Sequence, residues 1–561
     1  MNILGLSCHY HDAAACLVTD GALSHAAQEE RFDRRKNSAE FPLRAANACV
    51  QAAGASLMDL DAVGFYEKPY LKFLRVLTGH VRAFPWSYPA FIRTIPRWLQ
   101  DRLVLPLLVS SELGFDGDVL FINHHLSHAA SAFLPSPFER AAIITCDGVG
   151  EWATTSIGSG EGSRVGLLKE LRYPSSLGLL YSAVTTYLGF KANEQEGTVM
   201  GLAAQGRPRF AEGLSRVVDL APDGSFRVDQ RYLGINRGLR MYSRRFVKLF
   251  GPERQPGAPL EERHADMAAS LQQLVEQAVV ALARHAHEVT GLPDLCLAGG
   301  TFLNCVANSR IQQDAPFERV FIQPAAGDAG GALGVALYLS NCLYGEPRGA
   351  PMAHAYLGPE YSNDQIRRAI HVSQLEAALL RDDELEGQVA GLLARGKVVG
   401  WFQGRMEFGP RALGNRSILA DPRDPAIKQR INTLVKQREP FRPFSPVLPE
   451  ERAAEFFELS GPSPFMLLAP RVRPEAREAI PAVIHDDGTA RVQTVSRQTN
   501  PRLHSLLGQF EALSGVPVLL NTSFNRRGEP LVCTPDDALC CYRDSGMEAL
   551  VMGNYLLEKM T

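Results

Sequence analysis

Two groups of cations in the last third of the chain have the residue types that hold a small anion. The segment 404–417 places three arginines among three glycines, and Lys436, Arg438 and Arg442 follow within one expected short helix and a loop. Arginine presents a fork of N–H donors that matches phosphate or carboxylate oxygens, and glycine lets the backbone approach a ligand closely. Because the neighbours of these cations include Phe, Gly and Pro, we favour a shaped anion site over a solvated basic face.

Three histidines within five residues could bind a metal ion. His124 and His128 are four residues apart, so on a helix they project from one face; His125 and His128, three apart, are the alternative pair. Asp147 and Asp328, each expected at the end of a strand, could add oxygen ligands. Two imidazoles and two carboxylates suit Fe(II), Mn or Zn better than calcium, and leave a position for a phosphate oxygen. The alternative is a group of structural histidines.

Buried strands must position these side chains. The predicted strands of the first half are 2–7, 13–19, 22–28, 141–145, 295–298 and 320–323. Asp20-Gly21 is a hairpin signal between the second and third strands. The later three strands lead into glycine, with or without aspartate, and such turns surround a nucleotide and its metal with N–H groups and carboxylates. This layout predicts an α/β domain of the actin-like, sugar-kinase-type ATPase class that binds ATP.

A chain of 561 residues is too long for one hydrophobic core. The Gly- and Pro-rich segment 344–351 is the best linker. We therefore predict a first domain at 1–345, a linker at 346–360 and an α+β domain at 361–561. Residues 65–115, rich in aromatics, proline and arginine, are expected to form a helical insertion that serves packing or a lid rather than acceptor contact.

Composition narrows the range of partners. A net charge of -3 gives no general electrostatic attraction to nucleic acid, so we expect none as a partner. The 10 cysteines are scattered without CxxC spacing, which predicts reduced thiols in a cytoplasmic protein. We expect no signal peptide, because His9, His11 and Asp12 interrupt the apolar N-terminus. No apolar segment approaches the ~18–20 residues that span a bilayer, so no membrane partner is expected. A homodimer is left open.

Several segments taken together carry a family resemblance. They are residues 9–13, 29–32, 124–128, 299–304, 404–417 and 521–525. With these motifs the chain resembles the O-carbamoyltransferases of the NodU/CmcH/TobZ family over essentially its whole length. The resemblance implies an actin-like N-terminal domain and a C-terminal domain like YrdC. One departure is Thr198, where relatives often carry lysine, so no role of that lysine is transferred.

The resemblance also implies a reaction and its residues. Carbamoyl phosphate would yield carbamate in the second domain, carbamate and ATP would form carbamoyl adenylate, and the carbamoyl group would pass to the hydroxyl of a small-molecule, natural-product acceptor. The metal would be Fe(II), with Zn, Mn or Mg as alternatives, on His124, His128, Asp147 and Asp328. Carbamoyl phosphate would be bound by Arg411, Lys436, Arg442, Arg491, Asn521 and Ser523. The nucleotide would be bound by Gly299, Gly300, Asn304 and Gly327.

The N-terminal turn supplies the catalytic candidates. His11 is the candidate general base for the acceptor hydroxyl, because imidazole titrates near working pH, and Asp12 stands beside it. The alternative for His11 is a hydrogen-bonded turn residue. For Arg416 and Arg438, a structural role and a role in binding the anion are equally expected. Two other functions remain open: a tRNA threonylcarbamoyl-type modification enzyme, and a non-catalytic nucleotide-binding regulator with the same fold.

Overall fold

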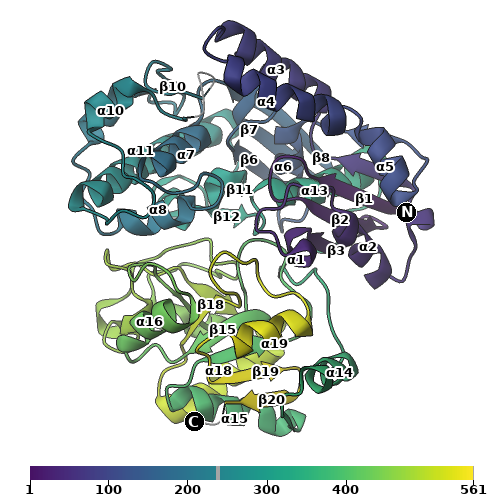
Figure 1. The fold of residues 1–561 in the computed structure, drawn as a ribbon, viewed down its shortest axis with the longest axis vertical. Coiled ribbons are helices and arrows are strands. Elements are labelled where there is room, and N and C mark those ends of the chain that lie inside the picture. The colour runs from purple at the N-terminus through teal and green to yellow at the C-terminus, as the bar shows by residue number, and fades with distance from the viewer. Residues whose placement is uncertain (236–239, 560–561) are drawn as a thin grey trace. The chain divides into compact units, whose positions relative to one another are not determined.

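The computed structural model describes residues 1–235 and 240–559, which form two compact units (Figure 1). The first unit contains Met1–Glu29 and Asn37–Met352, and the second contains Glu30–Lys36 and Ala353–Thr561. The division after Met352 falls inside the segment 346–360 that we assign to a linker. The sequence did not indicate that Glu30–Lys36 belongs to the second unit. Its arginines explain why, since Arg31 donates to the carbonyl of Gly409 at 2.8 Å and Arg34 to that of Leu531 at 2.6 Å.

The first unit is built on two five-stranded sheets. The first sheet contains β1 (Asn2–Ser7), β2 (Ala14–Thr19), β3 (Ala22–Gln28), β4 (Ala62–Phe65) and β5 (Val119–Phe121). The second contains β6 (Arg140–Cys146), β7 (Ala153–Glu161), β8 (Arg164–Arg172), β11 (Asp294–Ala298) and β12 (Arg319–Ile322). The predicted α/β class and the predicted strands are confirmed, including the β2–β3 hairpin at Asp20-Gly21.

The two sheets have the same topology. In the first, β1, β2 and β3 form an antiparallel meander, and β4 and β5 add in parallel on the free side of β1, giving the order β3-β2-β1-β4-β5. In the second, β6, β7 and β8 form the meander, and β11 and β12 add in parallel on the free side of β6. The duplication is one of topology, because the sequence shows no repeat.

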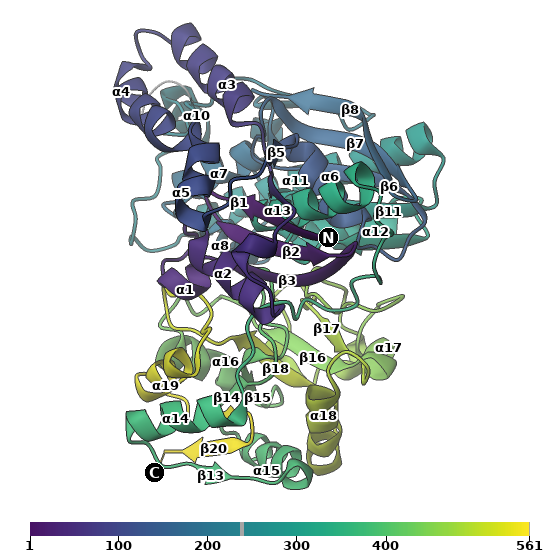
Figure 2. The ribbon, with the colours of Figure 1, turned by 90° about the vertical axis from the view of Figure 1, so that its right-hand side faces the viewer.

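Two helices are exchanged between these sheets. Helix α6 (His124–Phe133) follows the last strand of the first sheet but packs on β6, β7 and β11 of the second. Helix α13 (Asp328–Leu337) follows the last strand of the second sheet but packs on β1 and β2 of the first (Figure 2). The helices cross each other closely at Gly334, where an added Cβ atom would lie 1.8 Å from the carbonyl oxygen of Ser127.

The other elements of the first unit connect and surround these two sheets. They are α2 (Leu43–Ala52), η1 (Leu57–Asp59), α7 (Leu177–Tyr187), α8 (Glu196–Ala203), α9 (Ala211–Ser215), β9 (Val218–Leu220), β10 (Phe226–Val228), α10 (Arg244–Phe250), α11 (Glu262–Thr290), η3 (Gly300–Leu303), α12 (Cys305–Asp314) and η4 (Tyr338–Leu343). The predicted helical insertion lies between β4 and β5. It consists of α3 (Pro69–Arg82), α4 (Tyr88–Arg97), η2 (Trp98–Arg102) and α5 (Leu105–Leu113), and we call residues 69–113 the helical arm.

The second unit is a mixed eight-stranded sheet with helices on both faces. Its strands are β13 (Ala378–Leu379), β14 (Val399–Phe402), β15 (Arg416–Ala420), β16 (Ser445–Pro449), β17 (Gln493–Val495), β18 (Leu519–Ser523), β19 (Ala549–Met552) and β20 (Tyr555–Glu558). The strand order is β13-β20-β19-β14-β15-β18-β16-β17. Its helices are α1 (Glu30–Asp33), α14 (Asn363–Ser373), α15 (Asp382–Ala394), α16 (Ala426–Arg430), η5 (Ile431–Val435), η6 (Glu450–Arg452), α17 (Ala453–Phe456), η7 (Pro474–Ala476), η8 (Pro481–Val483), α18 (Pro501–Ser514) and α19 (Pro535–Arg543).

Alternation along the central strand separates two hydrophobic cores in this unit. Val399 and Trp401 of β14 pack with helices α15 and α18 on one face of the sheet. Val398 and Phe402 belong to the core on the other face, which includes α14 and α19. The period of two fits a sheet that is buried on both sides.

Two properties of the whole described chain complete the fold. All ten cysteines are free thiols. Within the described residues, no helix combines the length and the apolar character needed to cross a membrane.

Candidate functional site

The first candidate site lies where strands of the two matching sheets end. Asp147 directly follows β6, and Asp328 opens α13 after β12. His124 opens α6 after β5, and the turn with His11 follows β1. The carboxyl ends of the central strands are where open α/β sheets bind their ligands, because helix N-termini and loop side chains converge there.

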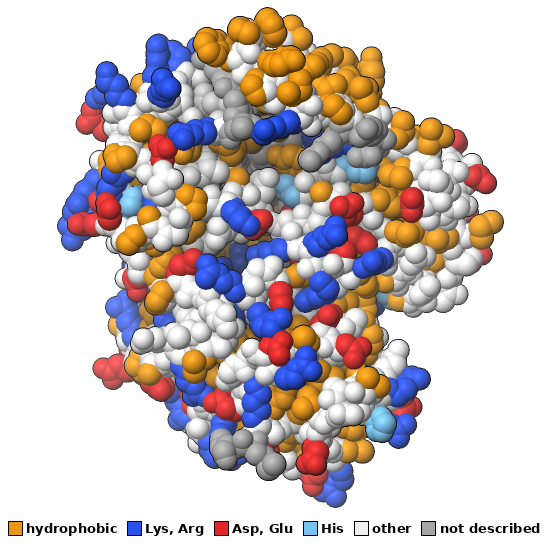
Figure 3. Space-filling view, viewed as in Figure 1, with side chains coloured by type: hydrophobic (Ala, Val, Ile, Leu, Met, Phe, Trp, Pro, Cys, Tyr) orange, Lys and Arg blue, Asp and Glu red, His pale blue; other side chains and the backbone are white. Residues whose placement is uncertain are grey.

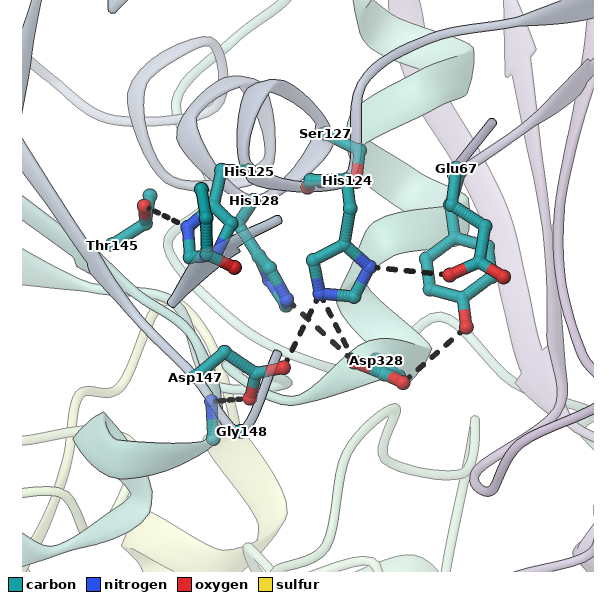
Figure 4. A network of polar contacts seen from close by, with 12 residues as sticks. Glu67, His124, His125, Ser127, His128, Thr145, Asp147, Gly148 and Asp328 are labelled. Carbon is teal, nitrogen blue, oxygen red and sulfur yellow. Dashed lines mark hydrogen bonds and ion pairs between the residues drawn. The ribbon is translucent and has the colours of Figure 1, made fainter. Parts of the chain in front are cut away.

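Four buried side chains come together at this place. His124, His128, Asp147 and Asp328 each offer one nitrogen or oxygen atom, and these four atoms lie within 4.8 Å of one another. Figure 4 shows His124 and His128 projecting from α6 toward the two aspartates. The structure therefore gathers the four residues that sequence spacing pointed to.

The distances suit a bound metal ion. The Nε2 atom of His124 lies 3.2 Å from Asp147 Oδ2 and 3.7 Å from Asp328 Oδ1, and His128 Nε2 lies 3.6 Å from Asp328 Oδ1. Metal bonds of about 2.0–2.2 Å to nitrogen and oxygen place neighbouring ligand atoms about 3.0–3.6 Å apart. His128 Nε2 and Asp328 Oδ1 are buried without a hydrogen-bond partner among the described residues, which fits groups that bind an ion.

His125 does not belong to this cluster. Its ring points away from the aspartates: Nδ1 lies 2.6 Å from Thr145 Oγ1 and Nε2 lies 3.0 Å from the carbonyl oxygen of Ala153. Burial, together with the nearby His124 and His128, lowers the pKa of His125 to about 3. Of the two pairs that the sequence left open, only His124 with His128 faces the aspartates.

Charge is concentrated in the cluster. Burial alone would lower the pKa of His124, but hydrogen bonds to Asp147 and Glu67 and the charge of Asp328 raise the pKa to about 10. Burial would raise the pKa of Asp328, but the charge of His11 and the contact with His128 lower the pKa to about 2. Both shifts favour the ionised form, so this pocket of carboxylates is stabilised by positive charge.

Sequence reasoning missed two carboxylates that hold His124 in place. The Oε2 atom of Glu67, at the end of β4, lies 3.5 Å from His124 Nδ1 and forms a buried ion pair with Lys72. Glu151 accepts hydrogen bonds from the backbone N–H of His124 at 3.1 Å and of Lys68 at 2.8 Å. A carboxylate that accepts from the second nitrogen of a metal-ligating histidine fixes its ring and its tautomer. Glu67 stands two residues after the buried strand β4, much as Asp147 follows β6, and this was the available signal.

The N-terminal turn brings His11 and Asp12 to the same cluster. His11 Nδ1 lies 2.9 Å from Asp12 Oδ2, and His11 Nε2 lies 3.9 Å from Asp328 Oδ2. Burial would lower the pKa of His11, but the carboxylates of Asp328 and Asp12 raise the pKa well above its usual value. Asp12 has φ 53°, a left-handed conformation that a non-glycine residue adopts at some cost. A proton on Nδ1 shared with Asp12 leaves Nε2 as the atom that can take up a second proton.

The glycine turns have more definite roles than the sequence suggested. Gly299 has φ 100°, and an added Cβ atom would lie 2.3 Å from the carbonyl oxygen of Cys146. The N–H of Gly300 donates to Asp147 Oδ1 at 2.9 Å, so this turn orients a member of the cluster. Asn304 caps α12 by accepting from the N–H of Ala307. Gly327 is the N-cap residue of α13, directly before Asp328.

The second candidate site is a group of cations in the second unit. The Lys436 ammonium is buried and donates to Ser523 Oγ at 3.1 Å and to Asn525 Oδ1 at 2.7 Å. Arg491 donates to Ser445 Oγ at 2.9 Å, and Ser445 is the register partner of Asn521 on the neighbouring strand. These contacts gather residues of β16 and β18 and of the loops that precede β16, precede β17 and follow β18.

Like charges oppose one another in this group. Burial and the neighbouring Arg438 lower the pKa of Lys436 well below its usual value. Burial lowers the pKa of Arg442 as well, and the charge of Arg491 adds to the shift, although Glu439 opposes it. Mutual repulsion of partly buried cations is relieved by a bound anion, which is the property expected of a phosphate site.

Asn521 and Arg411 border the same group. The Asn521 amide donates to Gln493 Oε1 at 2.7 Å and to the carbonyl of Ala412 at 3.3 Å, which places the loop of Arg411 beside β18. The buried Oδ1 atom of Asn521 has no hydrogen-bond partner among the described residues.

Arg416 and Glu407 organise the loop rather than bind a ligand. The buried Arg416 guanidinium donates to the carbonyls of Gln403, Gly404, Asn415 and Pro359 and lies 3.7 Å from the ring centre of Phe402. One oxygen of Glu407 accepts from three backbone N–H groups, those of Leu413, Asn415 and Arg416. Arg438, which donates to Asn432 Oδ1 at 2.8 Å, is likewise held by protein groups. The sequence left Arg416 and Arg438 open between the two roles and gave no signal for Glu407.

The two sites define an α/β protein with a buried centre suited to a metal ion and a partly buried group of cations suited to an anion. The chain belongs to the carbamoyltransferase family: residues 2–337 match the model of the carbamoyltransferase N-terminus and residues 390–559 match that of the C-terminus. It is therefore an enzyme that transfers carbamoyl groups.

Two relatives and one solved structure show the extent of the similarity. An uncharacterized protein of Synechocystis is 46% identical over the whole chain and 97% of its own length. Nodulation protein NolNO of Sinorhizobium fredii is 39% identical over 98% of the chain and 79% of its own. Component A of the (R)-2-hydroxyglutaryl-CoA dehydratase of Acidaminococcus fermentans aligns with 60% of the chain and 97% of its own at 13% identity. Its TM-score is 0.34, which is too low to assign a fold class.

Proposed function

We propose that this enzyme is an ATP-dependent O-carbamoyltransferase that takes the carbamoyl group from carbamoyl phosphate and places it on a hydroxyl of a small-molecule alcohol. The observation that carries the proposal is the presence of two charged centres in one carbamoyltransferase chain. One is a group of repelling cations around the buried Lys436, and the other is a buried cluster of two histidines and two aspartates. The matching sheets support an actin-like ATPase domain for the first unit, and we propose a YrdC-like domain for the second.

The donor reaction is assigned to the second unit. Arg411, Arg442 and Arg491 would bind the phosphate oxygens, and desolvation of the dianion would be offset by the cations that otherwise repel one another. Lys436 already donates to Ser523 and Asn525, so it would both hold the end of β18 and add positive charge. Asn521 would contact the carbamoyl amide through its oxygen. Water would cleave carbamoyl phosphate to carbamate and phosphate.

The activation and transfer steps are assigned to the first unit. Carbamate would attack the α-phosphate of ATP and release pyrophosphate, and the acceptor hydroxyl would then attack the carbamoyl carbon and release AMP. A divalent cation held by His124, His128, Asp147 and Asp328 would supply positive charge beside the nucleotide phosphates. We propose Fe(II), because mixed imidazole and carboxylate donors suit it, and Zn, Mn or Mg are the alternatives.

His11 and Asp12 are assigned to proton transfer. With a cation bound at Asp328 to offset that carboxylate, His11 would be neutral and keep its proton on Nδ1 beside Asp12, so that Nε2 could accept the proton of the acceptor hydroxyl as it attacks. Gly299, Gly300 and Asn304 would shape the nucleotide site mainly by positioning the cluster and α12. The backbone at Gly327, where α13 begins, would face phosphate oxygens, because a helix N-terminus favours negative charge.

Pyrophosphate release from ATP tests the proposal. With purified protein, release should depend on carbamoyl phosphate, and mass spectrometry should detect one added carbamoyl group on an accepted sugar or natural-product alcohol. A tRNA substrate would instead give carbamoylated nucleoside and a tRNA gel shift, which the net charge of -3 does not favour. A regulator would bind ATP without carbamoyl phosphate-dependent release. Either result would contradict the proposal.

A further inference from the structure

The helical arm, residues 69–113, exposes an unusual share of apolar surface. About half of the large apolar side chains exposed in the described chain lie between Tyr70 and Leu107, on this one insertion. Figure 3 shows them gathered at the top of the view, over α3 and α4, with lysines and arginines nearby. Large continuous apolar patches are rare on soluble proteins and mark surfaces that meet another phase or partner.

The exposed side chains follow the geometry of the arm. Tyr70, Leu74 and Val81 of α3 are spaced by four and seven residues, so they share one face of the helix. The turn between α3 and α4 continues this surface with Phe84, which is 69% exposed, and Trp86, which is 72% exposed. A tryptophan this exposed is uncommon, because it is usually among the most buried side chains.

The charge on the helical arm is mainly positive. Residues 69–113 contain six lysines and arginines against two acidic residues, Asp101 and Glu112, although the chain as a whole has net charge -3. Arg82 and Arg93 are exposed beside the apolar residues. Lys72 is buried in its ion pair with Glu67, and the half-buried Arg75 lies over the ring of Tyr173. The surface of the arm is therefore apolar and cationic.

We propose that the helical arm docks the enzyme on the surface of an anionic phospholipid bilayer. Exposed Trp, Phe, Tyr and Leu side chains would enter the boundary between headgroups and acyl chains, where aromatic rings are stable. Arg82 and Arg93 would contact anionic headgroups, each adding electrostatic attraction. The expectation of no membrane partner rested on the lack of a spanning segment and does not address a surface contact.

Charge distinguishes a bilayer from a second copy of the chain. In a two-fold dimer through this surface, the same mainly positive patch would face itself, and the two acidic residues of each arm would not balance its six cations. An anionic bilayer offers the complementary charge along with an apolar interior. The apolar residues and the cations are then both used by one partner.

Vesicle binding by the full chain tests this proposal. Wild-type protein should co-sediment with vesicles of phosphatidylcholine and phosphatidylglycerol, and less with phosphatidylcholine alone. The pair F84S and W86S should weaken this partitioning by at least about tenfold, and so should the pair R82E and R93E. All four side chains are exposed, so thermal melts should match wild type. V372S with L513S, which removes equally exposed apolar side chains of the second unit, is the matched control and should bind normally.

Four outcomes would overturn the proposal. They are no binding of the wild type to anionic vesicles, equal binding to neutral vesicles, normal binding by both arm variants, and loss of binding in the control. Sedimentation velocity without lipid adds one more: a wild-type dimer that becomes monomeric in F84S with W86S would assign the surface to a second copy.

Discussion

Replacement of Glu67 by glutamine should weaken metal binding although it leaves all four cluster residues unchanged. Glu67 Oε2 lies 3.5 Å from His124 Nδ1, and the His124 Nε2 atom faces Asp147 and Asp328. Loss of a carboxylate behind a metal-ligating histidine typically lowers metal affinity 10–100-fold, or about 1.4–2.7 kcal/mol. The assay is competition with a chelating dye for Fe(II) or Zn(II), on protein first stripped of metal.

The same substitution has a second effect that needs its own control. Glu67 is the ion-pair partner of Lys72, whose ammonium lies 5.0 Å from the ring centre of Tyr10 and is buried. An uncompensated buried charge costs about 3–5 kcal/mol in stability. The double variant E67Q with K72M removes both charges and should recover much of the lost stability while keeping the weak metal affinity.

The single variant K72M completes the comparison. It leaves the Glu67 carboxylate free to accept from His124, so metal affinity should stay within about threefold of wild type. Wild-type affinity in the double variant would refute the reasoning, because it would show that the Glu67 carboxylate does not act on His124. A loss in K72M as large as in the double variant would assign the effect to packing instead.

Three further predictions follow from other contacts. Phosphate or carbamoyl phosphate should raise the melting temperature of the wild type, and Arg442→Ala should abolish this rise. Arg416→Met should lower the melting temperature of the free protein but keep the rise. An undiminished phosphate effect in Arg442→Ala would show that Arg442 is not part of the anion site. His11→Asn should still release phosphate from carbamoyl phosphate but lose about 10²–10⁴-fold in transfer to the alcohol, and equal loss of both would mean that His11 supports the fold. Gly299→Ala should destabilise the protein by several kcal/mol in urea melts, because its Cβ atom would lie 2.3 Å from the Cys146 carbonyl oxygen; unchanged stability would contradict this close contact.

The sequence predicted the elements and much of the first site because those signals are local. His124 and His128 are brought to one face by helix spacing alone, and Asp147 and Asp328 follow short apolar runs that are typical of buried strands. Glu67 also follows such a run, but nothing local indicates which strand end meets which. That depends on the exchange of helices between two sheets, which no spacing reveals.

The roles of the residues in the second site could not be predicted from local sequence. Arginines such as Arg411 and Arg416 look alike in sequence, five residues apart in one glycine-rich loop. Only the fold separates them, because Arg416 is buried against four carbonyls and the ring of Phe402. The transfer of Glu30–Lys36 to the second unit is a long-range packing effect of the same kind.

The exchange of α6 and α13 has a consequence for how the first unit is assembled. Each sheet is covered at the centre by a helix whose sequence belongs to the other half of the unit. Each half, if it were produced alone, would leave the face covered by the exchanged helix exposed, so the two should fold and unfold as a single cooperative block in spite of their matching topologies. The histidines arrive on one exchanged helix and Asp328 on the other. The cluster can therefore form only when both halves have folded around each other, and an ion bound there would stabilise their association.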